Sequence, residues 1–226
     1  MMEKIVQISG DGSPTIFSQR FGATYHSIHG AATESLHVFI GLGLIPILDS
    51  GQKDIRILEI GFGSGLNLLL TIEALKEKDP VRIEYHAIEP FPIGEAMAKD
   101  LGLEHSLQFR PDDMNWWYEV HRHHHFKGTI GAQYVDVSMY EKTIEEFSVD
   151  LRFDLVYFDA FAPSTQPEMW TPEVFEKVHQ LMNPGGSLCT YCAKGDVKRA
   201  MRSVGFQVEA HPGPPRKREI TRAVKI

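Results

Sequence analysis

The chain lacks several features that would place it in a specialised class. Only two of its 226 residues are cysteines, which excludes a small fold held together by a network of disulfides. No apolar run approaches the length that spans a membrane, and residues 1–5 lack the apolar stretch of a secretory signal. Internal repeats and low-complexity tracts are absent as well. We therefore expect a globular protein in the cytoplasm, with no membrane partner.

The two cysteines, Cys189 and Cys192, lie three positions apart in a segment with the pattern of a β-strand. Side chains with this spacing point to opposite faces of a sheet, so the two sulfur atoms could not easily meet in a disulfide or on one zinc ion. We expect two reduced thiols.

A run of histidines, His121-Arg-His-His-His125, is a weak candidate for a metal site. Consecutive side chains on a helix or strand cannot all reach one ion, and no carboxylate lies close by in the sequence. We interpret the run as a solvated loop and expect no bound metal.

The charge of the chain is unevenly distributed. The formal net charge of −7 argues mildly against a nucleic-acid partner. Residues 194–226, however, contain nine Lys or Arg and only three Asp or Glu, so one end of the chain is basic. This end is compatible with docking on a phosphate backbone, and equally with solvated helix and strand faces.

Strand-like and helix-like segments alternate from residue 51 onward. We expect strands at 56–60, 82–89, 132–137, 153–159, 186–192, 206–211 and 218–225. We expect helices at 65–78, 93–101, 141–147, 171–182 and 195–204, the fourth capped by Thr171 and Pro172. Residues 1–50 are expected to add a hairpin (5–8 with 15–17) and a helix (32–48), packed on the core domain formed by 51–226.

This alternation predicts an α/β fold with a doubly wound, mostly parallel sheet of seven strands. Only a proline-rich turn separates the last two strands, so the final strand is expected to be antiparallel. Ligands of such sheets bind beyond the carboxyl ends of the strands.

Three glycines at alternate positions follow the first of these strands. Gly61, Gly63 and Gly65 stand at the predicted strand-to-helix turn, where glycine lets the backbone bend tightly and a ligand lie against it. The next strand ends at Glu89, whose carboxylate can accept both hydroxyls of a ribose. The pattern indicates a nucleoside cofactor, with a glycine-rich packing turn as the structural alternative.

The spacing of this loop favours S-adenosylmethionine over a dinucleotide. A pyrophosphate site usually has the spacing G-x-G-x-x-G, whereas the third glycine comes one residue earlier here. Glu59 precedes the loop, and its carboxylate suits a sulfonium and an ammonium but would repel a pyrophosphate. The pattern E-x-G-x-G-x-G resembles motif I of class I methyltransferases, which have a Rossmann-like fold with an antiparallel seventh strand. We expect cofactor contacts from Glu59, Gly61, Phe62, Gly63, Gly65, Asn67 and Glu89.

The strand at 153–159 ends in Asp159-Ala-Phe161-Ala-Pro163, beside the predicted cofactor loop. Methyl transfer to an amine requires an aligned, uncharged nitrogen and the exclusion of water. A carboxylate can accept the N–H bonds of the amine and receive its proton. We expect Asp159, Phe161 and Pro163 to form the catalytic segment, with Asp159 also close to the cofactor. Asp136, at the end of strand 132–137, is either a contact to the adenine amino group or a turn residue.

Longer motifs make the resemblance more specific. The run from Asp159 to Thr171 (DAFAPSTQPEMWT) resembles the D-G/A-F-A-P-x-x-x-P-E-M-W-T signature of the methyltransferase half of the MnmC family. The runs 58–67 (LEIGFGSGLN), 184–195 (PGGSLCTYCAKG) and 217–219 (KRE) are similar to further family motifs, and Glu34 with His37-Val-Phe39 resembles another.

The resemblance implies methylation of the aminomethyl group of 5-aminomethyl-2-thiouridine at the tRNA wobble position, with S-adenosylmethionine as cofactor and tRNA as partner. The substrate or RNA contacts that we infer with it are Tyr25, Glu34, Met169, Trp170, Lys198, Arg216, Lys217 and Arg218. Gly22 and Ala23 stand where the family has aspartates, so no substrate contact is carried over to them. Since the chain shows no FAD-dependent half, we expect another enzyme to supply the aminomethyl uridine.

Three alternatives remain open at this stage. The chain could methylate a small amine or another RNA, it could be a non-catalytic paralogue that binds the cofactor, or it could be a dehydrogenase. The intact segment from Asp159 to Trp170 argues against the second, and the glycine spacing and Glu59 argue against the third.

Overall fold

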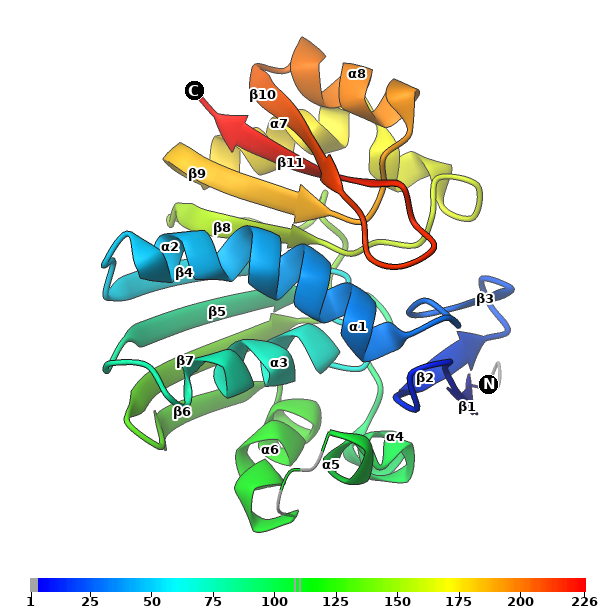
Figure 1. Ribbon diagram of the computed structural model, residues 1–226, viewed down its shortest axis with the longest axis vertical. Helices are drawn as coiled ribbons and strands as arrows, with labels where there is room; N and C mark the ends of the chain where they lie inside the picture. Colours follow the sequence, from blue (N-terminus) through cyan, green and yellow to red (C-terminus); the bar gives the residue numbers. More distant parts are fainter. Residues whose placement is uncertain (1–3, 108, 110) are drawn as a thin grey trace.

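The computed structural model describes residues 4–107, 109 and 111–226, which form two separate β-sheets and the helices around the larger one (Figure 1). The strands are β1 (Lys4–Ile8), β2 (Pro14–Ser18), β3 (Ala23–Thr24), β4 (Asp54–Ile60), β5 (Arg82–Ile88), β6 (His125–Ile130), β7 (Gln133–Tyr140), β8 (Phe153–Phe158), β9 (Met182–Thr190), β10 (Phe206–Pro212) and β11 (Glu219–Lys225). The helices are α1 (Ala31–Ser35), η1 (Leu36–Leu44), α2 (Ile45–Asp49), α3 (Leu66–Leu75), α4 (Glu95–Leu101), α5 (Leu103–Ser106), η2 (Pro111–Met114), α6 (Asn115–His123), η3 (Pro167–Trp170), α7 (Pro172–Leu181) and α8 (Gly195–Ser203).

The large sheet has the strand order β10-β11-β9-β8-β4-β5-β7-β6. Its five central strands are parallel, whereas β11 is antiparallel to both β9 and β10. The predicted doubly wound sheet with an antiparallel last strand is therefore confirmed. Within the described residues the sheet has eight strands rather than seven, because β6 adds an antiparallel edge to β7. None of the side chains of β6 is fully buried, so this edge strand carries little hydrophobic signal.

One helix prediction and the loop prediction for the histidine run were wrong. Residues 141–147 form turns rather than a helix, with Ile144 and Phe147 buried. The histidine run is not a loop: His121 is buried in α6, His124 ends that helix with a φ of 58°, and His125 begins β6. By contrast, α7 begins as predicted, with the Thr171 hydroxyl accepting a hydrogen bond from the Val174 amide.

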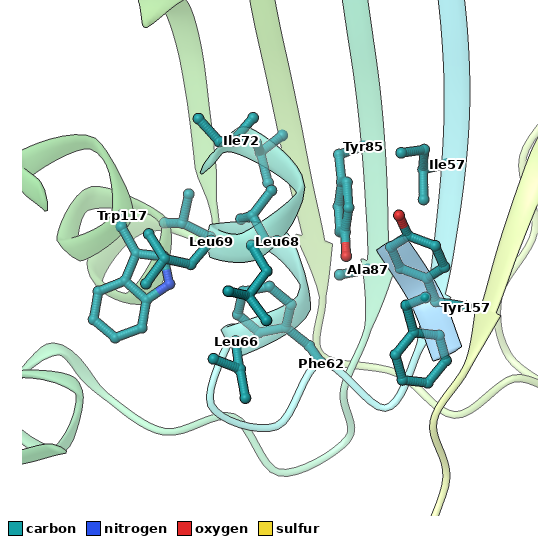
Figure 2. Packing of buried hydrophobic residues seen from close by; sticks show 14 of the residues in the cluster. Ile57, Phe62, Leu66, Leu68, Leu69, Ile72, Tyr85, Ala87, Trp117 and Tyr157 are labelled. Carbon is teal, nitrogen blue, oxygen red and sulfur yellow. The ribbon is translucent and has the colours of Figure 1, made fainter. Parts of the chain in front are cut away.

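The side chains of each strand alternate between two hydrophobic cores, one on each face of the sheet. One core packs Ile57, Tyr85 and Tyr157 against α3, η1 and α6, and Figure 2 shows part of it, with Leu66, Leu69 and Trp117 close together. The other packs residues such as Leu58 and Val156 against α7 and α8. Cys189 belongs to the first core and Cys192 to the second, and both are free thiols, as predicted.

Helices α1, η1 and α2 form one continuous helical segment, Ala31–Asp49, that lies on the first face of the sheet (Figure 1). Its middle is π-helical, and Gly43 lets it approach β8 and β9: a Cβ there would lie 3.1 Å from Leu155 and 3.4 Å from the Cys189 sulfur. In length and composition this is the one helix of the described residues that could cross a membrane. Val38, Phe39 and Leu44 are fully buried, however, which is the arrangement of a core helix.

The small sheet has the order β1-β2-β3, and its β1–β2 hairpin is the one predicted. It lies beside the carboxyl ends of the parallel strands (Figure 1). We call residues 4–26 the cap. The Asp11 carboxylate in its first turn accepts hydrogen bonds from the amide and the hydroxyl of Thr33, both at 2.8 Å, and so fixes the cap to the start of α1.

Candidate active site

The glycine loop between β4 and α3 passes directly against the end of β8. Gly61 has a φ of +89°, and a Cβ at this position would lie 2.5 Å from the carbonyl oxygen of Asp159. Its amide donates to the carbonyl of Ile88 at 3.0 Å, so the loop is also fixed to the end of β5. Gly65, with a φ of +76°, is the N-cap of α3. These positions need glycine, both for the sign of φ and for the close approach of the backbone.

Glu89, directly after β5, is held by the same loop. One carboxylate oxygen accepts the Gly63 amide at 3.0 Å, and the other accepts the Phe91 amide at 2.9 Å. Burial raises the pKa of Glu89, while these two amides and the charge of Lys4 act in the opposite direction. The carboxylate is therefore held in one orientation at the end of the strand.

Two further carboxylates share one amide group behind the loop. The Asn67 side-chain nitrogen donates to Glu59 at 2.8 Å and to Asp159 at 2.9 Å. The second oxygen of Glu59 accepts the Tyr85 hydroxyl at 2.7 Å. Glu59 is fully buried, and this burial raises its pKa well above the usual value despite both hydrogen bonds. Asn67 thus connects the strand before the glycine loop to the residue that follows β8.

Asp159 is the group in this network with a pKa near neutrality. Its pKa is raised to about 7, chiefly by burial; the hydrogen bond from Asn67 and the charge of Lys217 lower the pKa, and the charge of Glu34 raises it. A carboxyl group with such a pKa can accept a proton at physiological pH and release it again.

Gly61, Gly63, Glu89 and Asp159 line one wall of a pocket of about 260 Å³. The opposite wall is the cap, which contributes Arg20, Phe21, Tyr25 and His26. Phe161 connects the two walls: its ring stacks on Phe21 at 4.4 Å and meets the edge of Tyr25 at 5.5 Å, measured between ring centroids. The pocket is therefore acidic on one side and aromatic on the other.

Several predicted residues lie next to the pocket rather than in its lining. Met169 lines it, whereas Trp170 is buried behind it and donates from its indole nitrogen to the Phe161 carbonyl at 2.8 Å. Phe62 and Gly65 lie against His121 and Trp117, and the Trp117 indole donates to the Gly65 carbonyl at 3.2 Å. These residues stabilise the glycine loop by packing and do not line the pocket. Pro163 is partly exposed in the turn after Phe161.

Asp136 does not end its strand. Strand β7 continues to Tyr140, so Asp136 lies in the middle of this strand and forms an ion pair with Lys127 of β6 at 2.6 Å. The prediction of its position was wrong because the alternating pattern of the strand continues past Val137. In its place, Thr143, Ile144 and Glu145 after β7 line the pocket.

Two of the four basic side chains proposed for phosphate contacts are already paired. Lys198 is buried and binds Glu219 at 2.6 Å, and Lys217 binds Glu34 at 2.5 Å. Arg216 and Arg218 are exposed, and Arg216 contacts a ring nitrogen of His29 at 3.2 Å. Because the two members of each ion pair are far apart in the sequence, no local sequence pattern predicts these pairs.

The sequence did not predict most of the cap or two exposed residues that line the pocket, Glu145 and Glu168. It also missed Phe91, whose ring lies 3.7 Å from the Arg20 guanidinium carbon. An aromatic residue two positions after Glu89, the glutamate that follows β5, was the available signal for Phe91. For Arg20, the only sequence signal for a place at the pocket was the adjacent aromatic residue, Phe21.

Among the described residues, no group of three or more His, Cys, Asp or Glu is arranged to hold a metal ion. His121, at the start of the histidine run, instead packs its ring on Trp117 at 4.4 Å, and burial lowers its pKa to about 4. This histidine is a neutral packing residue beneath the glycine loop.

Comparisons with known proteins agree with this geometry. A family model described as S-adenosyl-L-methionine-dependent methyltransferase matches residues 112–226. The tRNA 5-methylaminomethyl-2-thiouridine biosynthesis bifunctional protein MnmC of Ralstonia nicotianae is 31% identical over 221 residues, which cover 95% of this chain and 33% of that protein. The protein of the same name from Cupriavidus necator is 34% identical over 215 residues, 91% of this chain and 32% of that protein.

The chain thus spans about a third of the length of these curated relatives. Among solved structures, MNMC2 from Aquifex aeolicus is 26% identical, with a TM-score of 0.75 over 99% of this chain and 71% of that one. The fold and the resemblance predicted from the sequence motifs are both confirmed.

Proposed function

Because this chain belongs to the S-adenosyl-L-methionine-dependent methyltransferase family, we propose that it methylates the aminomethyl group of 5-aminomethyl-2-thiouridine at the wobble position of tRNA, giving 5-methylaminomethyl-2-thiouridine. The names of the curated relatives, which are bifunctional proteins of 5-methylaminomethyl-2-thiouridine biosynthesis, support this substrate. The observation that carries the proposal is the position of Asp159, next to the glycine loop and in the pocket lining.

The residues of the sheet edge fit the cofactor. Gly61 and Gly63 leave the loop without side chains on the pocket wall, and Glu89 presents a fixed carboxylate where a ribose would be recognised. The carboxyl groups of Glu89 and Asp159 line the pocket and suit a ligand that carries a sulfonium and an ammonium, whereas Glu59 is fully buried outside the lining and binds Asn67. When bound, S-adenosylmethionine supplies a methyl group activated by its sulfonium.

Asp159 would act on the acceptor. Its carboxylate accepts N–H bonds from the amine and so orients the nitrogen lone pair, and its pKa of about 7 lets it receive the proton that an alkylammonium must lose. Phe161 and the cap aromatics Phe21 and Tyr25 exclude water from this position. Met169 lines the same pocket and would contact the target base.

For tRNA docking, the exposed Arg216 and Arg218 remain our candidates for phosphate contacts. They lie in the turn between β10 and β11, which Figure 1 shows beside α1. Such contacts are individually weak and depend on salt concentration.

The test is transfer of a labelled methyl group from S-adenosylmethionine to tRNA that carries the aminomethyl base, with tRNA lacking this base as the control. We expect label in the first tRNA only. A calorimetric titration with S-adenosylhomocysteine and with NADH checks the cofactor separately, and heat from NADH alone would contradict the assignment.

A second candidate is a small amine acceptor. Glu145 and Glu168 are exposed and line the pocket, so they would attract a free cationic amine and repel phosphates. Adding small alkylamines to the same assay distinguishes the two: label transferred to the amine but absent from tRNA rejects the RNA substrate.

A further inference from the structure

The turn between β10 and β11 is held on the N-terminal helix and on the turn before that helix by three contacts. The ring nitrogen of His37 lies 2.8 Å from the Pro212 carbonyl, Arg216 reaches His29, and the Lys217 ammonium binds the Glu34 carboxylate at 2.5 Å. Arg216 has a φ of +73°, which a residue with a side chain rarely adopts. This backbone conformation comes directly before Lys217, so the turn is constrained where it presents the lysine to Glu34.

Lys217 is also connected to the catalytic strand. Its ammonium lies 4.5 Å from the centre of the Tyr191 ring, and the Tyr191 hydroxyl donates to the carbonyl of Ala160 at 2.8 Å. Ala160 directly follows Asp159. Two steps of contact therefore lead from the Glu34–Lys217 pair to the backbone beside the proposed acceptor group.

From this geometry we propose that Lys217 and Glu34 are positioning residues, which hold the Asp159 segment in place from outside the pocket through Tyr191. This assignment replaces the phosphate contact expected for Lys217, and it rests on the role proposed for Asp159.

The charges around Asp159 make the two members of the pair distinguishable. Asn67 donates to its carboxylate from α3, Glu59 and Tyr85 face it from β4 and β5, and Tyr191 faces it from the segment after β9. The negative charge of Glu34 raises the pKa of Asp159, and the positive charge of Lys217 lowers it, both in addition to the larger effect of burial. Removing one charge or the other must therefore move the titration in opposite directions.

A second ion pair on the same hairpin serves as a matched control. Lys198 of α8 binds Glu219, the first residue of β11, at 2.6 Å. Both pairs join a lysine to a glutamate across elements, but the charges that shift the pKa of Asp159 include Lys217 and Glu34 and neither member of the Lys198 pair. Lys198→Met thus removes a comparable ion pair without removing a charge that acts on Asp159.

The experiment is a carboxyl ¹³C NMR titration of the cofactor-free protein, with the Asp159 resonance assigned by its loss in Asp159→Asn. We expect Lys217→Met to shift the Asp159 titration to higher pH and Glu34→Gln to shift it to lower pH. Lys198→Met should leave it unchanged, and Lys217→Arg should restore the wild-type titration. Shifts in the same direction for both members of the pair, or none, would overturn the proposal.

Turnover provides the second measurement. The acid limb of the pH–rate profile should follow the NMR titrations, so that Lys217→Met loses about twofold or more in turnover near pH 6.5. Its KM for tRNA and the salt dependence of binding should stay at wild-type values. A loss of tRNA affinity with a salt slope smaller by about one would identify Lys217 as a phosphate contact and reject the positioning role. Because the NMR titration needs no substrate, failure of the proposed tRNA reaction would not be confused with failure of this inference.

Discussion

The two walls of the pocket are built in different ways. The sheet edge consists of backbone turns and carboxylates, with Glu59 fully buried and every described carboxylate there bound by an amide or hydroxyl. The cap consists of partly exposed aromatic rings on a small sheet, which contact the sheet edge through Phe161. The first wall is rigid and charged, and the second is apolar and attached through a few contacts.

This difference separates the tasks of the site. Fixed carboxylates suit the recognition of a cationic donor and the transfer of a proton, both of which need defined positions. An aromatic cap on its own sheet suits closure over an acceptor and the exclusion of water, both of which need surface area. Substitutions in the first wall should therefore change chemistry and cofactor binding, and substitutions in the cap should change acceptor binding.

The largest effect is expected for Asp159→Asn. The amide cannot receive a proton, so turnover should fall by about 10²–10⁴-fold at saturating substrates, with little change in the affinity for S-adenosylhomocysteine. Asp150→Asn, at an exposed position before β8, is the control. Single-turnover kinetics and calorimetry measure the two quantities, and wild-type turnover in Asp159→Asn would remove this carboxylate from the mechanism.

Gly61→Ala tests the close approach of the loop to β8. The new Cβ would meet the Asp159 carbonyl and require a strained φ, so we expect a loss of about 1–3 kcal/mol in the free energy of unfolding. We also expect about tenfold weaker binding of S-adenosylhomocysteine. Gly51→Ala has nearly the same φ, +85° against +89°, but nothing lies within 4 Å of its Cβ. Equal losses in both variants would mean that φ alone, rather than the contact with Asp159, explains the glycine.

Phe21→Ala tests the cap. The variant loses the stacking on Phe161, which is worth about 0.5–1.5 kcal/mol, so KM for the acceptor should rise by about two- to tenfold. Cofactor affinity should stay the same, as it should in Ile8→Ala, an exposed position at the end of β1 of the cap. A change in cofactor affinity without a change in KM would contradict the division of tasks between the walls.

Asp11→Ala tests how the cap is attached, and its effect should be the smallest. Burial raises the pKa of Asp11, but hydrogen bonds from Ser13, Thr33 and Ser9 outweigh it and hold the pKa well below the usual value. The carboxylate therefore stabilises the fold above the unfolded-state pKa of about 3.9, and this contribution is lost as the pH falls below that value. We expect Asp11→Ala to cost about 1 kcal/mol at pH 7.

Thermal unfolding at several pH values measures this effect. The difference in Tm between Asp11→Ala and the wild type should shrink as the pH drops below about 4. Asp100→Ala, at an exposed position on α4, is the control. A difference that stays constant over the whole pH range would show that the ionised carboxylate is not what attaches the cap.

The sequence allowed the sheet edge to be predicted much better than the cap. A strand, a glycine turn and a helix follow one another locally, and parallel strands bring their carboxyl ends together, so Gly61, Glu89 and Asp159 could be placed without a structure. Asp136 was misplaced because the pattern of β7 does not mark where pairing stops. The ion pair of Lys217 could not be predicted because its partner, Glu34, lies 183 positions away in the sequence. The aromatic rings of the cap come together only through tertiary packing. A local sequence pattern therefore does not predict their contacts.

A crystal structure of the protein with S-adenosylhomocysteine tests the central claim most directly. The account predicts the ribose on Glu89, the sulfur facing Asp159, and a space for the acceptor between that sulfur and the rings of Phe21 and Phe161. In the present structure the Tyr25 ring lies so close to Gly63 that a Cβ there would be 2.9 Å from it. A ligand bound elsewhere, or a Tyr25 ring that keeps this position at saturating ligand, would contradict the account.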